Sequence, residues 1–180
     1  MHGKVIVADM TRRDDVRRTV DETIASCGRV DVWVNHVGEG ITRPPSQLTD
    51  DDVDFKARGA GHVINITSML GRIPLAIIRS AYNGAKHFLN ALTVNFRTEV
   101  QATHPGIQFT LVSPGVVRTE FGKNARHGGP DSRELPDSPS AEEVAAVIAG
   151  AIESRTPDVY TRARAHGRVV EYFTSLGADP

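Results

Sequence analysis

Residues 62–86 read HVINITSMLGRIPLAIIRSAYNGAK, and this stretch decides the fold class. It opens with an apolar, β-branched run at residues 62–67, which is typical of a buried strand. It ends inside a second pattern, at about residues 81–103, where apolar side chains recur at helical spacing. The apolar stripe consists of Ala81, Ala85, Phe88, Leu89, Leu92 and Phe96. A buried strand followed by an amphipathic helix predicts one βα unit.

The same alternation extends over the rest of the chain. Further strands are predicted at residues 4–9, 30–35, 108–113 and 158–160. Further helices are predicted at about residues 11–28, 140–154 and 162–176. Repeated βα units build a mostly parallel sheet with helices on its faces, so the sequence predicts an α/β fold.

Local signals mark several helix ends. Thr11 is expected to cap the first helix and Gly28 to end it. Ser140, with a glutamate three residues later, has the spacing of a capping box. Thr49, followed by three aspartates, predicts another helix start. Residues 116–139 are rich in Gly, Pro, Ser and charge, which predicts a surface segment or lid.

Composition limits the classes of function. The 180 residues carry a formal charge of −1, with 39% hydrophobic residues, which fits one domain over residues 1–180. Positive and negative charges are balanced and only 6% of the residues are aromatic, so the composition does not indicate nucleic-acid binding. No bilayer-length apolar run or signal peptide is visible, and the single cysteine, Cys27, cannot form an internal disulfide. We therefore expect a cytoplasmic protein without membrane contact. The seven histidines lack metal-ligand spacing, so we expect no metal site.

Tyr82 and Lys86 are the first candidates for chemistry. They are four residues apart, which places both side chains on one face of the predicted helix. A phenol has a reference pKa of about 10, and a nearby positive charge favours its ionised form. Such a phenol comes closer to acid/base work at neutral pH. The spacing also arises by chance, so the pair alone is only suggestive.

Hydroxyl groups and turns follow the two strands that flank this helix in sequence. Ser68 ends the first of these strands, and Ser113, Pro114 and Gly115 end the second. In an open parallel sheet, ligands bind beyond the carboxyl ends of the strands. We therefore expect Ser68, Tyr82 and Lys86 to face one crevice.

With these groups in this order, the sequence resembles the classical short-chain dehydrogenase/reductase family. The resemblance rests on six short motifs in register over nearly the whole chain. They are Asp9-Met-Thr11, Asn35-His-Val-Gly38, Ser68 with Gly71, the Tyr82/Lys86 pair, Pro114-Gly115, and Thr119. The resemblance implies a Rossmann-like, doubly wound sheet that binds NAD or NADP.

The resemblance also implies a role for each catalytic residue. Tyr82 is expected to be the general acid/base that exchanges a proton with the substrate oxygen. Lys86 is expected to lower the pKa of Tyr82 and to hold the nicotinamide ribose. Ser68 is expected to form a hydrogen bond with the substrate carbonyl or alcohol.

The remaining motifs imply contacts with the cofactor. Asp9 is expected beside the adenine, and Asn35 is expected to brace the sheet near the cofactor, with Gly38 in the same motif. The Pro114-Gly115 turn and Thr119 are expected to contact the nicotinamide carboxamide.

The sequence departs from the family pattern in two places. It contains no glycine-rich turn, and its first predicted strand matches the family's third, so two βα units are expected to be absent from this truncated member. Most of a central helix, with its active-site asparagine, is missing after Phe55. These losses are expected to leave strand edges unpaired and to uncover part of the stripe formed by Phe88, Leu92 and Phe96.

Two hypotheses follow from the sequence. The first is an NAD(P)-dependent oxidoreductase, a homo-oligomer, that interconverts a small secondary alcohol and a ketone. The second is a catalytically inactive remnant that acts, if at all, through association with other subunits. Cofactor titration of the 180-residue chain distinguishes them, because only the enzyme needs to bind the dinucleotide.

Overall fold

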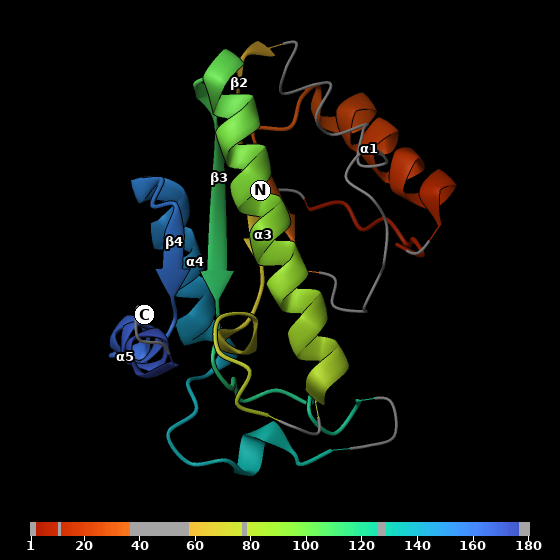
Figure 1. The fold of residues 1–180 in the computed structure, drawn as a ribbon. Helices are drawn as coiled ribbons and strands as arrows, with labels where there is room; N and C mark the ends of the chain where they lie inside the picture. Colours follow the sequence, from red (N-terminus) through yellow and green to blue (C-terminus); the bar gives the residue numbers. More distant parts are fainter. Residues whose placement is uncertain (1–2, 11, 37–57, 77–78, 126–128, 177–180) are drawn as a thin grey trace.

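The computed structural model describes residues 3–10, 12–36, 58–76, 79–125 and 129–176 (Figure 1). At its centre is a four-stranded parallel sheet with the strand order β1-β2-β3-β4. The strands are β1 (Val32–Asn35), β2 (Ala60–Ile66), β3 (Gly106–Ser113) and β4 (Asp158–Tyr160). The predicted α/β class and parallel sheet are therefore confirmed.

Helices cover both faces of this sheet. They are α1 (Arg13–Cys27), α3 (Ser80–Thr103), α4 (Ala141–Ser154) and α5 (Ala165–Leu176), with short 3-10 turns η2 (Met69–Gly71) and η4 (Ser132–Glu134). In Figure 1, α3 crosses in front of β2 and β3, and α4 lies behind them.

The central strands alternate their side chains between two apolar clusters. Val63, Val100, Ile107 and Phe109 form one cluster, against which Val30, Trp33 and Phe96 pack. Ile64, Ile66 and Val112 form the other, with Ile148, Ile152 and Val159 packed against it. Because successive strand residues point to opposite faces, the first cluster joins the sheet to α3 and the second joins it to α4. This is the doubly wound arrangement of layers.

Two of the predicted helix caps, at the end of α1 and at the start of α4, are confirmed. Gly28 has a φ of 80°, and its amide donates to the carbonyl of Ile24 at 2.7 Å, which ends α1. Ser140 and Glu143 form the complete capping box of α4. The predicted cap at Thr11 and the helix start at Thr49 lie outside the described residues.

The predicted strand at residues 4–9 is wrong. Val5 and Val7 are 89% and 85% exposed, and this segment has no strand conformation. It lies along α1 instead, where Arg18 donates to the carbonyl of Val7 at 2.8 Å. A strand needs a neighbour for its amides and carbonyls, and within the described part of the chain β1 pairs only with β2. An apolar, β-branched run without a partner strand therefore remains irregular.

The buried face of α3 is mostly polar. Its buried residues are Asn83, Lys86, Asn90, Thr93 and Val100. Phe96, from the predicted apolar stripe, packs on the sheet, whereas Phe88 is 46% exposed. The exposure of Phe88 agrees with the expectation that part of this stripe is uncovered.

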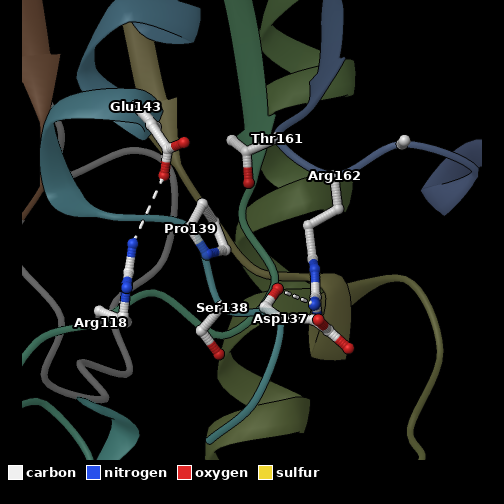
Figure 2. A pocket seen from close by; sticks show the side chains of 8 residues that line it. Arg118, Asp137, Ser138, Pro139, Glu143, Thr161 and Arg162 are labelled. Atoms are coloured by element: carbon white, nitrogen blue, oxygen red, sulfur yellow. Dashed lines mark hydrogen bonds and ion pairs between the residues drawn. The ribbon is translucent and has the colours of Figure 1, made fainter.

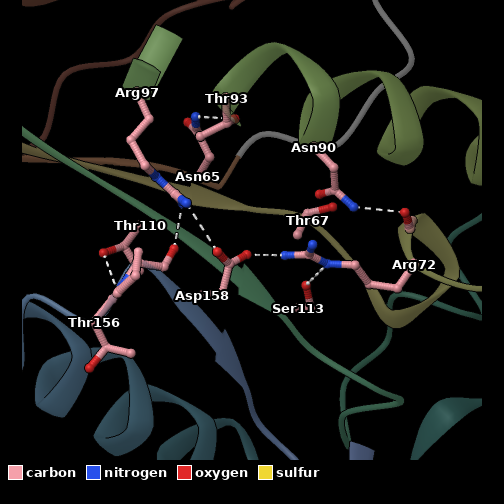
Figure 3. A network of polar contacts seen from close by, with 12 residues as sticks. Asn65, Thr67, Arg72, Asn90, Thr93, Arg97, Thr110, Ser113, Thr156 and Asp158 are labelled. Carbon is pink, nitrogen blue, oxygen red and sulfur yellow. Dashed lines mark hydrogen bonds and ion pairs between the residues drawn. The ribbon is translucent and has the colours of Figure 1, made fainter. Parts of the chain in front are cut away.

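Ion pairs fasten the short strand β4 to the rest of the fold (Figure 3). Asp158 pairs with Arg72, which follows η2, and with Arg97 of α3 at 3.1 Å. Arg72 also donates to Ser113 Oγ at 3.1 Å, and Arg97 donates to the carbonyl of Pro157 at 2.6 Å. One carboxylate thus connects β4 to the elements that carry the candidate site.

The described helices fall short of the combined length and apolar character that a membrane-spanning helix needs. In the same ranges, His, Cys, Asp and Glu side chains do not gather in threes that could hold a metal ion.

Candidate active site

Ser68 lies where β2 ends, at the same edge of the sheet as the end of β3. Its Oγ accepts a hydrogen bond from the amide of Leu70 at 3.1 Å and so caps η2. The next amide, of Met69, donates to the carbonyl of Pro114 at 2.8 Å. This bond joins the segments that follow β2 and β3, so Ser68 and the Pro114-Gly115 turn are held at one edge.

Gly71 brings α3 close to this edge. A Cβ added to Gly71 would lie 2.9 Å from the backbone C and O of Lys86 and from its Cβ. Only glycine permits this approach of η2 to the helix. Asn90, one turn after Lys86, donates to the carbonyl of Gly71 at 2.7 Å and fixes the contact.

The three predicted catalytic side chains come together at this contact. The Ser68 side chain lies near enough to the Tyr82 phenol to lower the pKa of that phenol. The Nζ of Lys86 lies 5.7 Å from the centroid of the Tyr82 ring. The same Nζ donates to the carbonyl of Ile66 at 2.9 Å, which leaves two of its three N–H groups for other partners.

Burial shifts the pKa values of both Tyr82 and Lys86. Burial raises the pKa of Tyr82 above its ordinary value, while the Ser68 side chain and the charge of Arg79 act in the opposite direction. Burial also lowers the pKa of Lys86. The charge that lowers the pKa of Tyr82 in this structure is that of Arg79, and the effect of Lys86 on this pKa stays a prediction.

Arg79 and Phe121 are neighbours of the site that the sequence analysis missed. The Phe121 ring lies 5.8 Å from the Tyr82 ring, at an interplanar angle of 56°. The guanidinium of Arg79 lies 5.9 Å from the centroid of Phe121. Arg79 is three residues before Tyr82, a helical spacing that was available as a signal. Phe121 comes from the segment at residues 116–139, and no local pattern connects it to Tyr82.

The loop after β3 carries the residues predicted to contact the nicotinamide. A Cβ on Gly115 would lie 2.5 Å from Cδ of Arg162, so a larger residue there would displace the side chain of this arginine. The Oγ1 of Thr119 accepts from the amide of Phe121 at 3.4 Å, which places Thr119 beside the aromatic neighbour of Tyr82.

An open pocket of about 580 Å³ adjoins this loop (Figure 2). Its lining residues are Arg118, Asp137, Ser138, Pro139, Glu143, Thr161, Arg162 and Ala163. Two arginines and two carboxylates line it, so its charges are balanced. Arg162 is held by the carbonyl of Asp137, and Arg118 lies 4.0 Å from Glu143.

Comparison with known proteins identifies this arrangement. The family model described as short chain dehydrogenase matches residues 53–129. A short-chain dehydrogenase structure from Streptomyces avermitilis is 27% identical, with a TM-score of 0.72, over 95% of this chain and 74% of that chain. The chain belongs to the short-chain dehydrogenase/reductase family.

Curated members of the family show the same similarity. Dehydrogenase/reductase SDR family member 11 from Bos taurus is 38% identical over 138 residues, which are 63% of this chain and 53% of that protein. The A-factor type gamma-butyrolactone 1'-reductase (1S-forming) of Streptomyces virginiae is 30% identical over 151 residues, 72% of this chain and 58% of that protein. The chain spans about half the length of the curated relatives it matches. Its Rossmann-like sheet is accordingly incomplete beside those of the solved family members.

The other predicted cofactor-binding residues of this short-chain dehydrogenase/reductase lie elsewhere. Asn35, at the end of β1, donates to Asn65 Oδ1 at 2.8 Å, and Asn65 donates to Thr93 at 2.9 Å. These bonds join β1 to β2 and β2 to α3, and the role of Asn35 near a cofactor stays a prediction. Asp9 does not end a strand, and its amide donates to Asp15 at 2.9 Å at the start of α1. In Figure 1, this end of α1 lies away from the N-terminal end of α3. Gly38 lies outside the described residues.

The donors beside Tyr82 fit the nicotinamide half of a dinucleotide. Among the described residues, Lys86 uses one N–H group, for the carbonyl of Ile66, and its other two N–H groups suit the hydroxyls of a ribose. The pyrophosphate half normally lies on a glycine-rich turn, which these 180 residues do not contain.

Proposed function

We propose that this chain is an NAD- or NADP-dependent oxidoreductase that interconverts a secondary alcohol and a ketone, with Tyr82 as general acid/base. The nearness of the Ser68 side chain and of the Lys86 ammonium to the Tyr82 ring carries the proposal. These three side chains lie at the carboxyl edge of a parallel sheet, where such folds bind ligands. We further propose that residues 1–180 act as one partial Rossmann-like domain.

The state of Tyr82 favours reduction of a ketone. Because burial raises its pKa, the phenol is protonated at neutral pH and can give its proton to the carbonyl oxygen. Ser68 donates a hydrogen bond to the same oxygen, which orients the substrate. A bound nicotinamide would supply the hydride for reduction or accept it in the reverse reaction. After reduction, the phenolate regains its proton from solvent, and the charge of Arg79 stabilises it until then.

The proposed cofactor contacts are divided between two groups of residues. Lys86 would hold the nicotinamide ribose through its two remaining N–H groups. Pro114, Gly115 and Thr119 would meet the carboxamide. Asn35, together with Gly38 and Asp9, is proposed to serve the rest of the dinucleotide, although Asp9 would need to act from the start of α1.

Relatives support a nicotinamide cofactor without choosing between its two forms. A short-chain dehydrogenase/reductase from Burkholderia phymatum was solved with NAD, at a TM-score of 0.72 and 17% identity. A short-chain dehydrogenase from Sphingobium yanoikuyae was solved with NADPH, at a TM-score of 0.67 and 20% identity. We therefore propose either NAD or NADP for this chain.

The Tyr82→Phe variant tests the proposal. It removes the proton donor alone, so turnover of a ketone panel should fall by about 10²- to 10⁴-fold. Cofactor affinity, measured by thermal shift, should stay within a few-fold of wild type. Tyr172→Phe, a partly buried tyrosine on α5, is the matched control and should leave both values unchanged. Unchanged turnover in Tyr82→Phe would reject the assignment. Lys86→Met should weaken both turnover and cofactor binding.

A second candidate is a catalytically inactive chain that acts through association with other subunits. The exposed apolar side chains of Val34 on β1 and Phe88 on α3, 44% and 46% exposed, favour association. Self-association also suits the enzyme, for which we propose a homo-oligomer. Light scattering of wild type and Phe88→Glu tests association. Absence of a thermal shift with millimolar NAD, NADH, NADP and NADPH would favour the inactive chain.

A further inference from the structure

Arg79 is a charged side chain at the active site that hydride and proton transfer do not require. It is the N-cap residue of α3, three positions before Tyr82. Its guanidinium lies over Phe121, and Phe121 packs against Tyr82. These contacts form one surface that runs from the cation, across an aromatic ring, to the reactive phenol.

The charge of Arg79 has no counter-ion among the residues that the structure describes. Seven other described arginines each pair with a carboxylate: Arg18, Arg29, Arg58, Arg72, Arg97, Arg118 and Arg133. Arg79 is partly buried, like Arg72 and Arg97, but its side-chain neighbours are an aromatic ring and a phenol. Lys86, the other cation at the site, donates to a main-chain carbonyl. Among the described residues, the positive charge beside the proton donor is therefore not compensated by a carboxylate, and an anionic ligand would stabilise it.

We propose that Arg79 binds an anionic group of the substrate, so that the substrate is a ketone or alcohol with a carboxylate or phosphate within a few carbon atoms of the reacting carbon. This inference rests on the proposed function. The guanidinium lies 5.9 Å from the centroid of Phe121, and the Tyr82 ring lies 5.8 Å from the same ring, so a small substrate can reach both the charged group and the phenol. The guanidinium fork suits either anion, and the face of Phe121 suits the carbon chain that joins the two ends.

Paired substrates separate this role from a simple effect on Tyr82. Acetoacetate and its methyl ester differ by the one negative charge of a carboxylate. Dihydroxyacetone phosphate and dihydroxyacetone differ by a phosphate, which carries a charge of about −1.5 to −2 at pH 7. If Arg79 binds the anion, Arg79→Gln should lower the ratio of kcat/KM for the charged over the neutral member by about 10- to 100-fold. Arg79→Lys should restore part of that ratio. Arg168→Gln, an exposed arginine on α5, is the control and should not change it. The pair that responds identifies the anion as carboxylate or phosphate.

The inference would be overturned if Arg79→Gln left the ratio of kcat/KM for charged over neutral substrates unchanged. An equal fall in the turnover of all substrates counts as such a result. The latter result would mean that Arg79 acts on the phenol alone. A calorimetric titration of the same charged and neutral compounds, in the presence of NADP, gives a readout without turnover. Loss of acetoacetate or phosphate-ester binding in Arg79→Gln supports the inference even if no substrate is turned over. Turnover of neutral ketones with no charge preference supports the proposed function and refutes the inference.

Discussion

The Gly71→Ala substitution tests how the active-site helix is positioned. The new methyl carbon would lie 2.9 Å from three atoms of Lys86, of which two belong to the backbone. A backbone cannot rotate out of the way as a flexible side chain can, so α3 and η2 must separate. Overpacking of this kind costs about 1 to 3 kcal/mol of unfolding free energy. In a chain of this size, that corresponds to a Tm lower by about 3 to 9 °C.

The same separation displaces Lys86 and Tyr82 from Ser68. A shift of about 1 Å in an active site can cost about 10²-fold in rate, so kcat/KM should fall more than the loss of folded protein explains. Urea unfolding followed by circular dichroism measures the stability, and the rate is measured well below the transition.

Gly150→Ala is the matched control for this experiment. Gly150 is an exposed glycine within α4, and a Cβ there has no atom within 4 Å. This variant should gain about 0.5 to 1 kcal/mol, because alanine restricts the unfolded chain more than glycine does. If Gly71→Ala matched wild type in both stability and rate, close packing of η2 on α3 would not be what positions Lys86.

Three further substitutions probe the fold around the site. Asp158→Asn removes the carboxylate shared by two partly buried guanidinium groups, so urea unfolding should show a loss of about 1 to 3 kcal/mol. A loss that high salt abolishes would contradict this burial. Burial lowers the pKa of His62, so the unfolded chain takes up its proton first as the pH falls. Wild type should therefore lose stability between pH 7 and 5.5, whereas His62→Gln should lose less, and parallel pH curves would refute the assignment. Ser140→Ala breaks the capping box of α4 and should lower stability by about 1 kcal/mol, as measured by thermal melting.

The parts of the fold that the sequence predicts are those specified by local patterns. All four strands form within two residues of their predicted positions, and the apolar runs of the central strands β2 and β3 are largely buried. Residues 4–9 have an equally apolar run, yet they form no strand. A single sequence does not show whether a neighbouring strand is available, and pairing decides the outcome.

The candidate site also contains residues that local patterns predict and residues that they do not. Spacing brought Ser68, Tyr82 and Lys86 into the prediction, since each lies at the end of a strand or on one helical face. Phe121 was missed because its contact with Tyr82 spans 39 residues and depends on how the loop after β3 folds back. Burial, which a sequence does not give, raises the pKa of Tyr82 and outweighs the side chains that lower it.

The polar underside of α3 restricts how this helix can be redesigned. Lys86 and Asn90 donate to main-chain carbonyls, and Thr93 accepts from Asn65, so directional bonds specify a single azimuth of the helix. Apolar packing would let the helix rotate about its axis by several degrees. These hydrogen bonds, in contrast, break together if the helix rotates. Directed-evolution libraries aimed at new substrates should therefore keep the buried polar residues of α3 unchanged. They should vary exposed positions instead, where substitutions do not displace Tyr82 and Lys86.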